Sequence, residues 1–234
     1  MFNIAQSPTP KLLTRAAFAR PAETATEKSL FALPVDSKPR RSQGSGARGC
    51  AQGDLSEVTL LIPSKEVVGQ TVSARPAFFW QVSQPVSEPI KFAITHPDAI
   101  EPLYETQVKA SEGGIVKVQL PADLPELVPG QPYAWTVSLI CNERRPSANP
   151  FYSTWIERVP METRLEDQLA AATSDRDRAR IYAEAGAWYD ALNLLYQAKE
   201  ENPDDPQIQA DWLALLAVVG FPEVASSNHV TSNQ

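Results

Sequence analysis

The hydrophobic pattern of this chain changes period at Pro160, and this change limits the folds that the chain can adopt. Between residues 55 and 160, apolar and polar residues alternate in short runs bounded by proline and glycine, which is typical of half-buried β-strands. After Pro160, apolar residues recur at helical spacing. The 234 residues suffice for two such parts. We therefore predict a β-domain at 55–160 and an α-helical part at 161–226.

Seven strands are predicted in the β-domain, near residues 58–62, 75–82, 90–95, 103–110, 115–120, 133–141 and 153–159. The run from Tyr133 to Cys141 alternates most regularly. This pattern predicts an antiparallel β-sandwich of the immunoglobulin-like or fibronectin-like kind. In such a sandwich Trp80 and Trp135 fill the space between the sheets and Tyr133 fastens a corner, an interpretation that we favour over a sugar-stacking platform.

The helical part is divided by clear start and stop signals. A first helix is predicted within residues 162–172, and Ser174 with Asp177 forms a capping pair for the next, which ends at Gly186. A third helix runs to Asn202 and Pro203, and a fourth covers 206–219. These boundaries predict short helices that pack as antiparallel hairpins.

A 34-residue interval separates Gly186 from Gly220 and Ala191 from Ala225, which is the period of tetratricopeptide repeats. Only about one and a half units fit the pattern, whereas peptide-binding superhelices need three or more. We therefore predict a short tetratricopeptide-like hairpin region with a small docking surface.

Two arginines of the second helix are candidates for binding a partner. If the repeat alignment holds, Arg176 and Arg180 lie one turn apart on its inward face, where a partner's carboxylate could bind. The alternative is that they pair in solvent with nearby carboxylates, namely Asp175, Asp177 or Glu184.

The ends of the chain lack a persistent apolar period. Residues 1–54 are predicted to form a flexible arm and linker, and 227–234 a disordered tail. Gly44, Gly46 and Gly49 spell the dinucleotide fingerprint, but no strand and helix flank them, so we interpret them as linker. The sequence shows neither an export signal nor a transmembrane helix.

Charge is distributed unevenly along the chain. Residues 1–54 carry eight Lys or Arg against four acids, whereas 161–234 carry five against thirteen. Because phosphate contacts need clustered cations, nucleic acid is not a predicted partner of the acidic body. The sequence carries no signal for an oligomeric state.

The two cysteines, Cys50 and Cys141, are candidates for a disulfide. A bridge between them would close a loop of about 90 residues and contribute roughly 4 kcal/mol through loop entropy. We favour the bridge because Cys50 ends a segment in which it has no packing role, and two separate thiols are the alternative.

No constellation of reactive side chains points to catalysis, a metal or a cofactor. His96 lies in a Thr-His-Pro turn and His229 in a polar tail, and neither lies at ligand spacing from a cysteine. We predict a protein that is not an enzyme. An alternative to protein binding is a glycan-binding module that uses Trp155 or Tyr152 beside the Arg144 and Arg145 loop.

Several stretches together resemble one cyanobacterial family, domain of unknown function 928. They are Leu60-Leu61-Ile62-Pro63, Arg75-Pro76 to Trp80, Tyr133-Ala134-Trp135 to Cys141, Trp155 to Val159, and Tyr182 to Leu192. The resemblance covers roughly residues 40–225 and is most specific in its last stretch. It implies an extracytoplasmic location, which favours the bridge between Cys50 and Cys141; a cytoplasmic location is the alternative, because this sequence shows no export signal. It implies no activity and no site residues. The leading hypothesis is a protein-binding adaptor of the cell envelope.

Overall fold

The structure is a computed structural model, and it describes residues 40–44, 58–218 and 230–232. The strands are β1 (Gln43–Gly44), β2 (Val58–Leu60), β3 (Gly69–Thr71), β4 (Ala77–Val82), β5 (Val86–Thr95), β6 (Tyr104–Ala110), β7 (Gly114–Gln119), β8 (Pro132–Leu139), β9 (Phe151–Arg158) and β10 (Val230–Ser232). The helices are α1 (Thr163–Ala171), α2 (Asp175–Glu184), α3 (Trp188–Glu201) and α4 (Pro206–Val218), with a short 3-10 helix at Pro146–Ala148.

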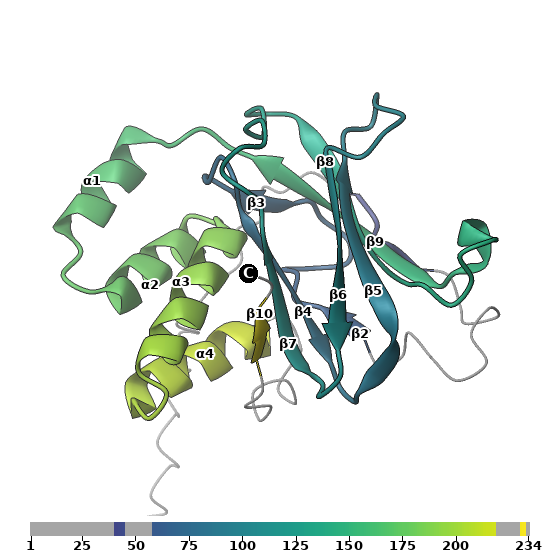
Figure 1. Ribbon diagram of the computed structural model, residues 1–234. Helices are drawn as coiled ribbons and strands as arrows, with labels where there is room; N and C mark the ends of the chain where they lie inside the picture. The colour runs from purple at the N-terminus through teal and green to yellow at the C-terminus, as the bar shows by residue number, and fades with distance from the viewer. Residues whose placement is uncertain (1–39, 45–57, 219–229, 233–234) are drawn as a thin grey trace, which may run out of the picture.

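Two β-sheets form the body of the protein (Figure 1). One has the order β1-β9-β8-β5-β6, with β3 also paired to β9, and the other has the order β10-β7-β4-β2. Most pairs are antiparallel, whereas β3 with β9 and β10 with β7 are parallel. Phe78 and Trp80 of one sheet pack against Phe92 of the other, at ring distances of 4.9 and 6.1 Å. The predicted β-sandwich is thus confirmed.

The regular alternation of β8 places one side of the strand in the core. Its alternate residues Tyr133, Trp135, Val137 and Leu139 are all buried, and the residues between them are half-buried. The Tyr133 hydroxyl accepts a hydrogen bond from the backbone N–H of Val128 at 3.1 Å. Core packing of the predicted aromatic residues is confirmed, and the tyrosine fastens the preceding turn as expected.

Four helices follow the strands, close to the predicted boundaries. The Ser174 hydroxyl accepts a hydrogen bond from the Asp177 N–H, so the predicted cap of α2 is confirmed. Gly186 separates α2 from α3 with a φ of 80°, a left-handed conformation that favours glycine. On α3 the predicted core residues Ala191, Leu195 and Ala198 are buried.

The first turn of α3 reaches into the sandwich. The Tyr189 ring lies 5.8 Å from Phe78 and 6.5 Å from Trp135, which belong to different sheets. The Trp135 Nε1–H donates to the Tyr189 hydroxyl at 2.9 Å, and the Trp188 Nε1–H donates to the Leu61 carbonyl at 3.0 Å. A single cluster of buried apolar residues therefore runs from the sheets into the helices.

Strand β4 is buried on both of its faces because the helices cover the sheet. Phe79 lies beside the Tyr196 ring of α3, at 5.1 Å, while its neighbours Phe78 and Trp80 face the opposite sheet. All three rings are fully buried. This explains why the β4 segment is continuously apolar where a half-buried strand would alternate.

Three short strands were not predicted. Strand β1 lies within the predicted flexible arm and pairs with β9, and Gly44 fits there because a Cβ would lie 2.7 Å from the Tyr152 ring. Strand β3 continues the same edge of β9, and β10 lies within the predicted disordered tail but pairs with β7. Backbone hydrogen bonds form these pairs, so strands of two or three residues need no side-chain pattern.

Several predicted features lie outside the described residues: Gly46 and Gly49 of the fingerprint, Cys50, Gly220, Ala225, His229 and most of the arm at 1–54. The repeat of the Gly186 unit and the pairing of the cysteines therefore stay predictions.

Candidate functional site

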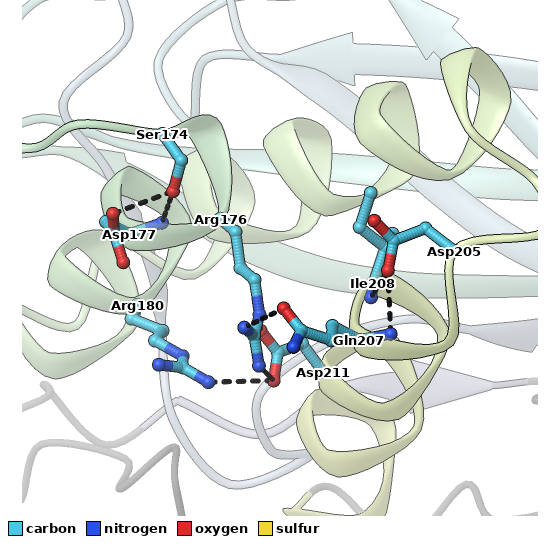
Figure 2. A network of polar contacts seen from close by, with 8 residues as sticks. All are labelled: Ser174, Arg176, Asp177, Arg180, Asp205, Gln207, Ile208 and Asp211. Atoms are coloured by element: carbon cyan, nitrogen blue, oxygen red, sulfur yellow. Dashed lines mark hydrogen bonds and ion pairs between the residues drawn. The ribbon is translucent and has the colours of Figure 1, made fainter.

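Arg176 and Arg180 both contact Asp211 of α4, as Figure 2 shows. Arg176 binds the carboxylate through Nε and Nη2, and Arg180 donates from Nη2 to Asp211 Oδ1 at 3.1 Å. Arg176 also donates to the Gln207 side chain at 2.8 Å. These contacts join α2 to α4, so the acceptor lies on another helix and is none of the three carboxylates considered from the sequence.

The Asp211 side chain is 1% exposed, and each arginine side chain is 28% exposed. A buried carboxylate is stable only with charged or hydrogen-bonding partners, and the two arginines supply them. The hydrogen bond to Asp211 raises the pKa of Arg176. Arg180 keeps a buried Nε–H that has no hydrogen-bond partner within the described part of the chain.

The sequence does contain a signal for Asp211, although Asp211 was not among the predicted site residues. Asp211 lies three residues after Ile208 and four before Leu215, and both of these are buried on the apolar face of α4. A charged residue on the apolar face of a helix needs a partner from another element. The position of Asp211 on the apolar face of the predicted helix at 206–219 was therefore enough to expect an ion pair with this residue.

Side-chain caps define the starts of the two helices that carry this network (Figure 2). Ser174 caps α2, and the Ser174 hydroxyl also donates to Asp177 Oδ2 at 2.7 Å. At the start of α4, Asp205 Oδ1 accepts hydrogen bonds from the backbone N–H groups of Gln207 and Ile208, at 2.8 and 3.3 Å. Local hydrogen bonds thus stabilise the start of each of the two helices that contribute residues to the network.

Two cavities lie where the helices meet the sandwich. The larger has a volume of about 470 Å³ and lies between α1, α2 and the ends of β3 and β9. Its apolar lining comes from Val72, Val159, Pro160, Leu165, Ile181, Ala185 and Ala187, and its polar lining from Gln70, Glu162, Arg164, Gln168 and Glu184. The only buried residue of α1 is Leu165, so this helix contacts the body through few side chains.

The smaller cavity, of about 290 Å³, lies between α2, α3 and the segment that joins β3 to β4. Asp190, in the first turn of α3, lines it. Asp190 Oδ2 accepts hydrogen bonds from the Thr71 hydroxyl and the Val72 N–H, both at 2.9 Å. These bonds attach α3 to the end of β3, and no motif in the sequence had indicated this role.

Burial raises the pKa of Asp190 from 3.8 to about 6, although the hydrogen bonds from Val72 and Thr71 oppose the shift. Because the folded-state pKa is the higher one, this group stabilises the fold most below pH 4, and the contribution is lost as the pH rises through 6.

We therefore expect Asp190→Asn, which keeps an acceptor oxygen for Thr71 and Val72, to become relatively more stable as the pH rises. Between pH 4 and pH 8 the difference in unfolding free energy between variant and wild type should shift by about 2 kcal/mol in favour of the variant. Urea unfolding at several pH values measures it. A difference independent of pH would contradict the raised pKa.

The two aromatic candidates for glycan binding do not lie on one face of the sheet. Tyr152 and Trp155 are three residues apart on the regular strand β9, so their side chains point to opposite faces. Tyr152 packs against the core and Gly44, whereas the Arg40 guanidinium lies 4.1 Å from the centre of the Trp155 ring. Both rings are half-buried. Glycan binding stays a prediction, and it would rest on one ring.

Cys141 packs at the edge of the core just after β8, and the Asn149 side chain accepts a hydrogen bond from its N–H at 3.1 Å. Its predicted partner Cys50 lies outside the described residues. His96 lies beside Asp98, 3.9 Å away, and beside the Tyr133 ring. Within the described part of the chain, no group of three or more His, Cys, Asp or Glu residues could hold a metal ion.

Comparisons with known proteins identify a family. The family model described as Domain of Unknown Function (DUF928) matches residues 43–229. A search of curated proteins found no match. Among solved structures, a DUF3244 family protein with an immunoglobulin-like β-sandwich fold from Bacteroides vulgatus is 12% identical, with a TM-score of 0.28; the match covers 51% of this chain and 97% of that one. In the described residues no helix is long and apolar enough to cross a membrane.

Proposed function

Since this chain belongs to the DUF928 family, whose description assigns no activity, we propose a function from its geometry: a non-catalytic adaptor that binds a protein partner in the cell envelope. The observation that carries the proposal is the larger cavity. It combines apolar side chains with charged and amide side chains from two helices and the sandwich. Protein interfaces have this composition, with an apolar centre and a polar rim.

The charge of this region indicates the kind of segment that would bind. Glu162 and Glu184 line the cavity against one cation, Arg164. Residues 161–234 carry five cations and thirteen acids, so the surrounding field is negative. We infer that the occupant is an extended, basic segment of a partner protein with an apolar side chain that packs near Leu165 and Ile181.

The arrangement of α2, α3 and α4 is a second observation that supports the proposed binding function. We interpret them as a short tetratricopeptide-like unit, because α2 and α3 form a hairpin around Gly186 with Ala191 at the buried crossing. The family resemblance further implies a cyanobacterial source and an extracytoplasmic location, where a bridge between Cys50 and Cys141 would persist. The exposed parts of Arg176 and Arg180, whose side chains are each 28% exposed, would add a contact to a partner's carboxylate.

Charge reversal at the rim tests the proposal. We expect the double variant Glu162→Lys and Glu184→Lys to lose at least roughly tenfold of the partner that the wild-type chain enriches from native envelope extract, because like charges would then meet. Quantitative mass spectrometry of the purified complexes measures this.

The matched control is Glu166→Lys with Asp167→Lys, which makes the same charge change at exposed positions of α1 outside the cavity. Equal loss in the control would contradict binding in the cavity. If deletion of residues 1–39 increased partner binding, the basic arm of this chain would be identified as a competing occupant.

A further inference from the structure

Among the charged residues that line the smaller cavity, Asp190 is the one without an ion-pair partner in the described part of the chain. Two arginines line the cavity, and each already has a carboxylate: Arg75 lies 3.6 Å from Glu126, and Arg178 lies 2.5 Å from Asp175. The hydrogen-bond donors to Asp190 are the Thr71 hydroxyl and backbone N–H groups, all of them uncharged. An ionised carboxylate at the wall of a cavity without a countercharge is costly, so a cation is its natural complement.

A buried acceptor without a hydrogen-bond donor lies in the same cavity. Asn193 follows Asp190 by three residues on α3, so both side chains lie on one face of the helix. Its Oδ1 atom is buried and has no hydrogen-bond partner among the described residues. Leaving such an acceptor unsatisfied costs free energy that a bound donor would recover.

The remaining walls suit a cation that carries a short apolar chain. The tyrosines Tyr182 and Tyr189 line the cavity, and Leu194 adds an aliphatic surface. Aromatic rings attract ammonium groups and contact their alkyl carbons. A volume of about 290 Å³ admits a small group and excludes a folded peptide.

We propose that this cavity binds a primary ammonium group, with Asp190 as the charged acceptor and Asn193 Oδ1 as the second acceptor. A primary ammonium has three donors, which Asp190 and Asn193 can accept together, whereas a quaternary ammonium has none. The group can come from a free alkylamine, a lysine side chain or a peptide N-terminus. This site is separate from the larger cavity and does not rest on the proposed adaptor function.

Calorimetric titration of the full chain tests the assignment. The probes are butylamine, Nα-acetyl-lysine amide and triglycine, with butanol as an uncharged probe of similar size. We expect at least one ammonium probe to bind with a Kd of roughly millimolar order and butanol not to bind. The probe that binds most tightly identifies the source of the ammonium group.

Variants separate the site from general attraction to an acidic protein. Asp190→Asn and Asn193→Leu should each weaken binding at least roughly tenfold, whereas Asp167→Asn, the same change as the first on an exposed part of α1, should leave binding unchanged. If Asp190→Asn fails to fold, Asn193→Leu carries the test. The proposal is overturned if no ammonium probe binds the folded wild type, or if both cavity variants bind as tightly as Asp167→Asn.

Discussion

Replacing Arg176 and Arg180 together by alanine is expected to lower the free energy of unfolding by about 3 kcal/mol, since it leaves a buried carboxylate without a partner. Asp211 is 1% exposed, and its side-chain hydrogen bonds come from these two arginines. Chemical denaturation followed by tryptophan fluorescence measures the loss. The reason is the cost of an uncompensated buried charge, which exceeds the net contribution of an exposed ion pair.

Two control variants isolate that cause. Adding Asp211→Asn to the double variant removes the orphaned charge, so part of the stability should return. The pair Arg144→Ala and Arg145→Ala removes the same charge from an exposed loop and should change stability by less than about 0.5 kcal/mol. If the Arg144 and Arg145 variant lost as much unfolding free energy as the Arg176 and Arg180 variant, the arginines of α2 would not be needed to stabilise the buried Asp211 carboxylate. Partner binding by the Arg176 and Arg180 variant should be compared only at equal folded fractions.

The second large effect is expected at Tyr189. Tyr189→Ala should cost about 4 kcal/mol, because it empties the space that the ring occupies between Phe78 and Trp135. Since one buried cluster includes both sheets and the helices, we expect strands and helices to lose stability together in a single transition. Far-ultraviolet circular dichroism and tryptophan fluorescence should give the same midpoint.

Tyr189→Phe is the matched control, because it keeps the ring and removes only the hydroxyl that accepts from Trp135. It should cost about 1 kcal/mol. The opposite result would be two transitions in Tyr189→Ala, with the helices unfolding first and the sandwich unfolding at the wild-type denaturation midpoint. That result would contradict a core shared by the sheets and the helices.

Local patterns were sufficient to predict most of the fold. The alternation through Tyr133 and Trp135 indicated a strand with one buried face, and the Ser174 cap and the turn at Gly186 marked the helices. Each of these signals depends on residues close together in the sequence. They therefore predicted element types and boundaries, but not which elements meet.

The features that were missed depend on distant residues. Thr71 and Asp190 are 119 positions apart, and Arg176 and Asp211 are 35 apart. No periodicity in one segment reveals a partner in another, and β3 is too short to show a pattern of its own. Arg176 and Arg180 were recognised as candidates, but the acceptor that explains their position was found only when α4 was placed beside α2.

The position of Tyr189 also sets the order in which the chain can acquire its structure during synthesis. All strands from β1 to β9 leave the ribosome before α3, yet the space between Phe78 and Trp135 stays unfilled until residue 189 emerges. Strand β10 completes the edge of β7 later still. The nascent sandwich therefore exposes aromatic surface until α3 has been made, which delays folding of the strands made before it.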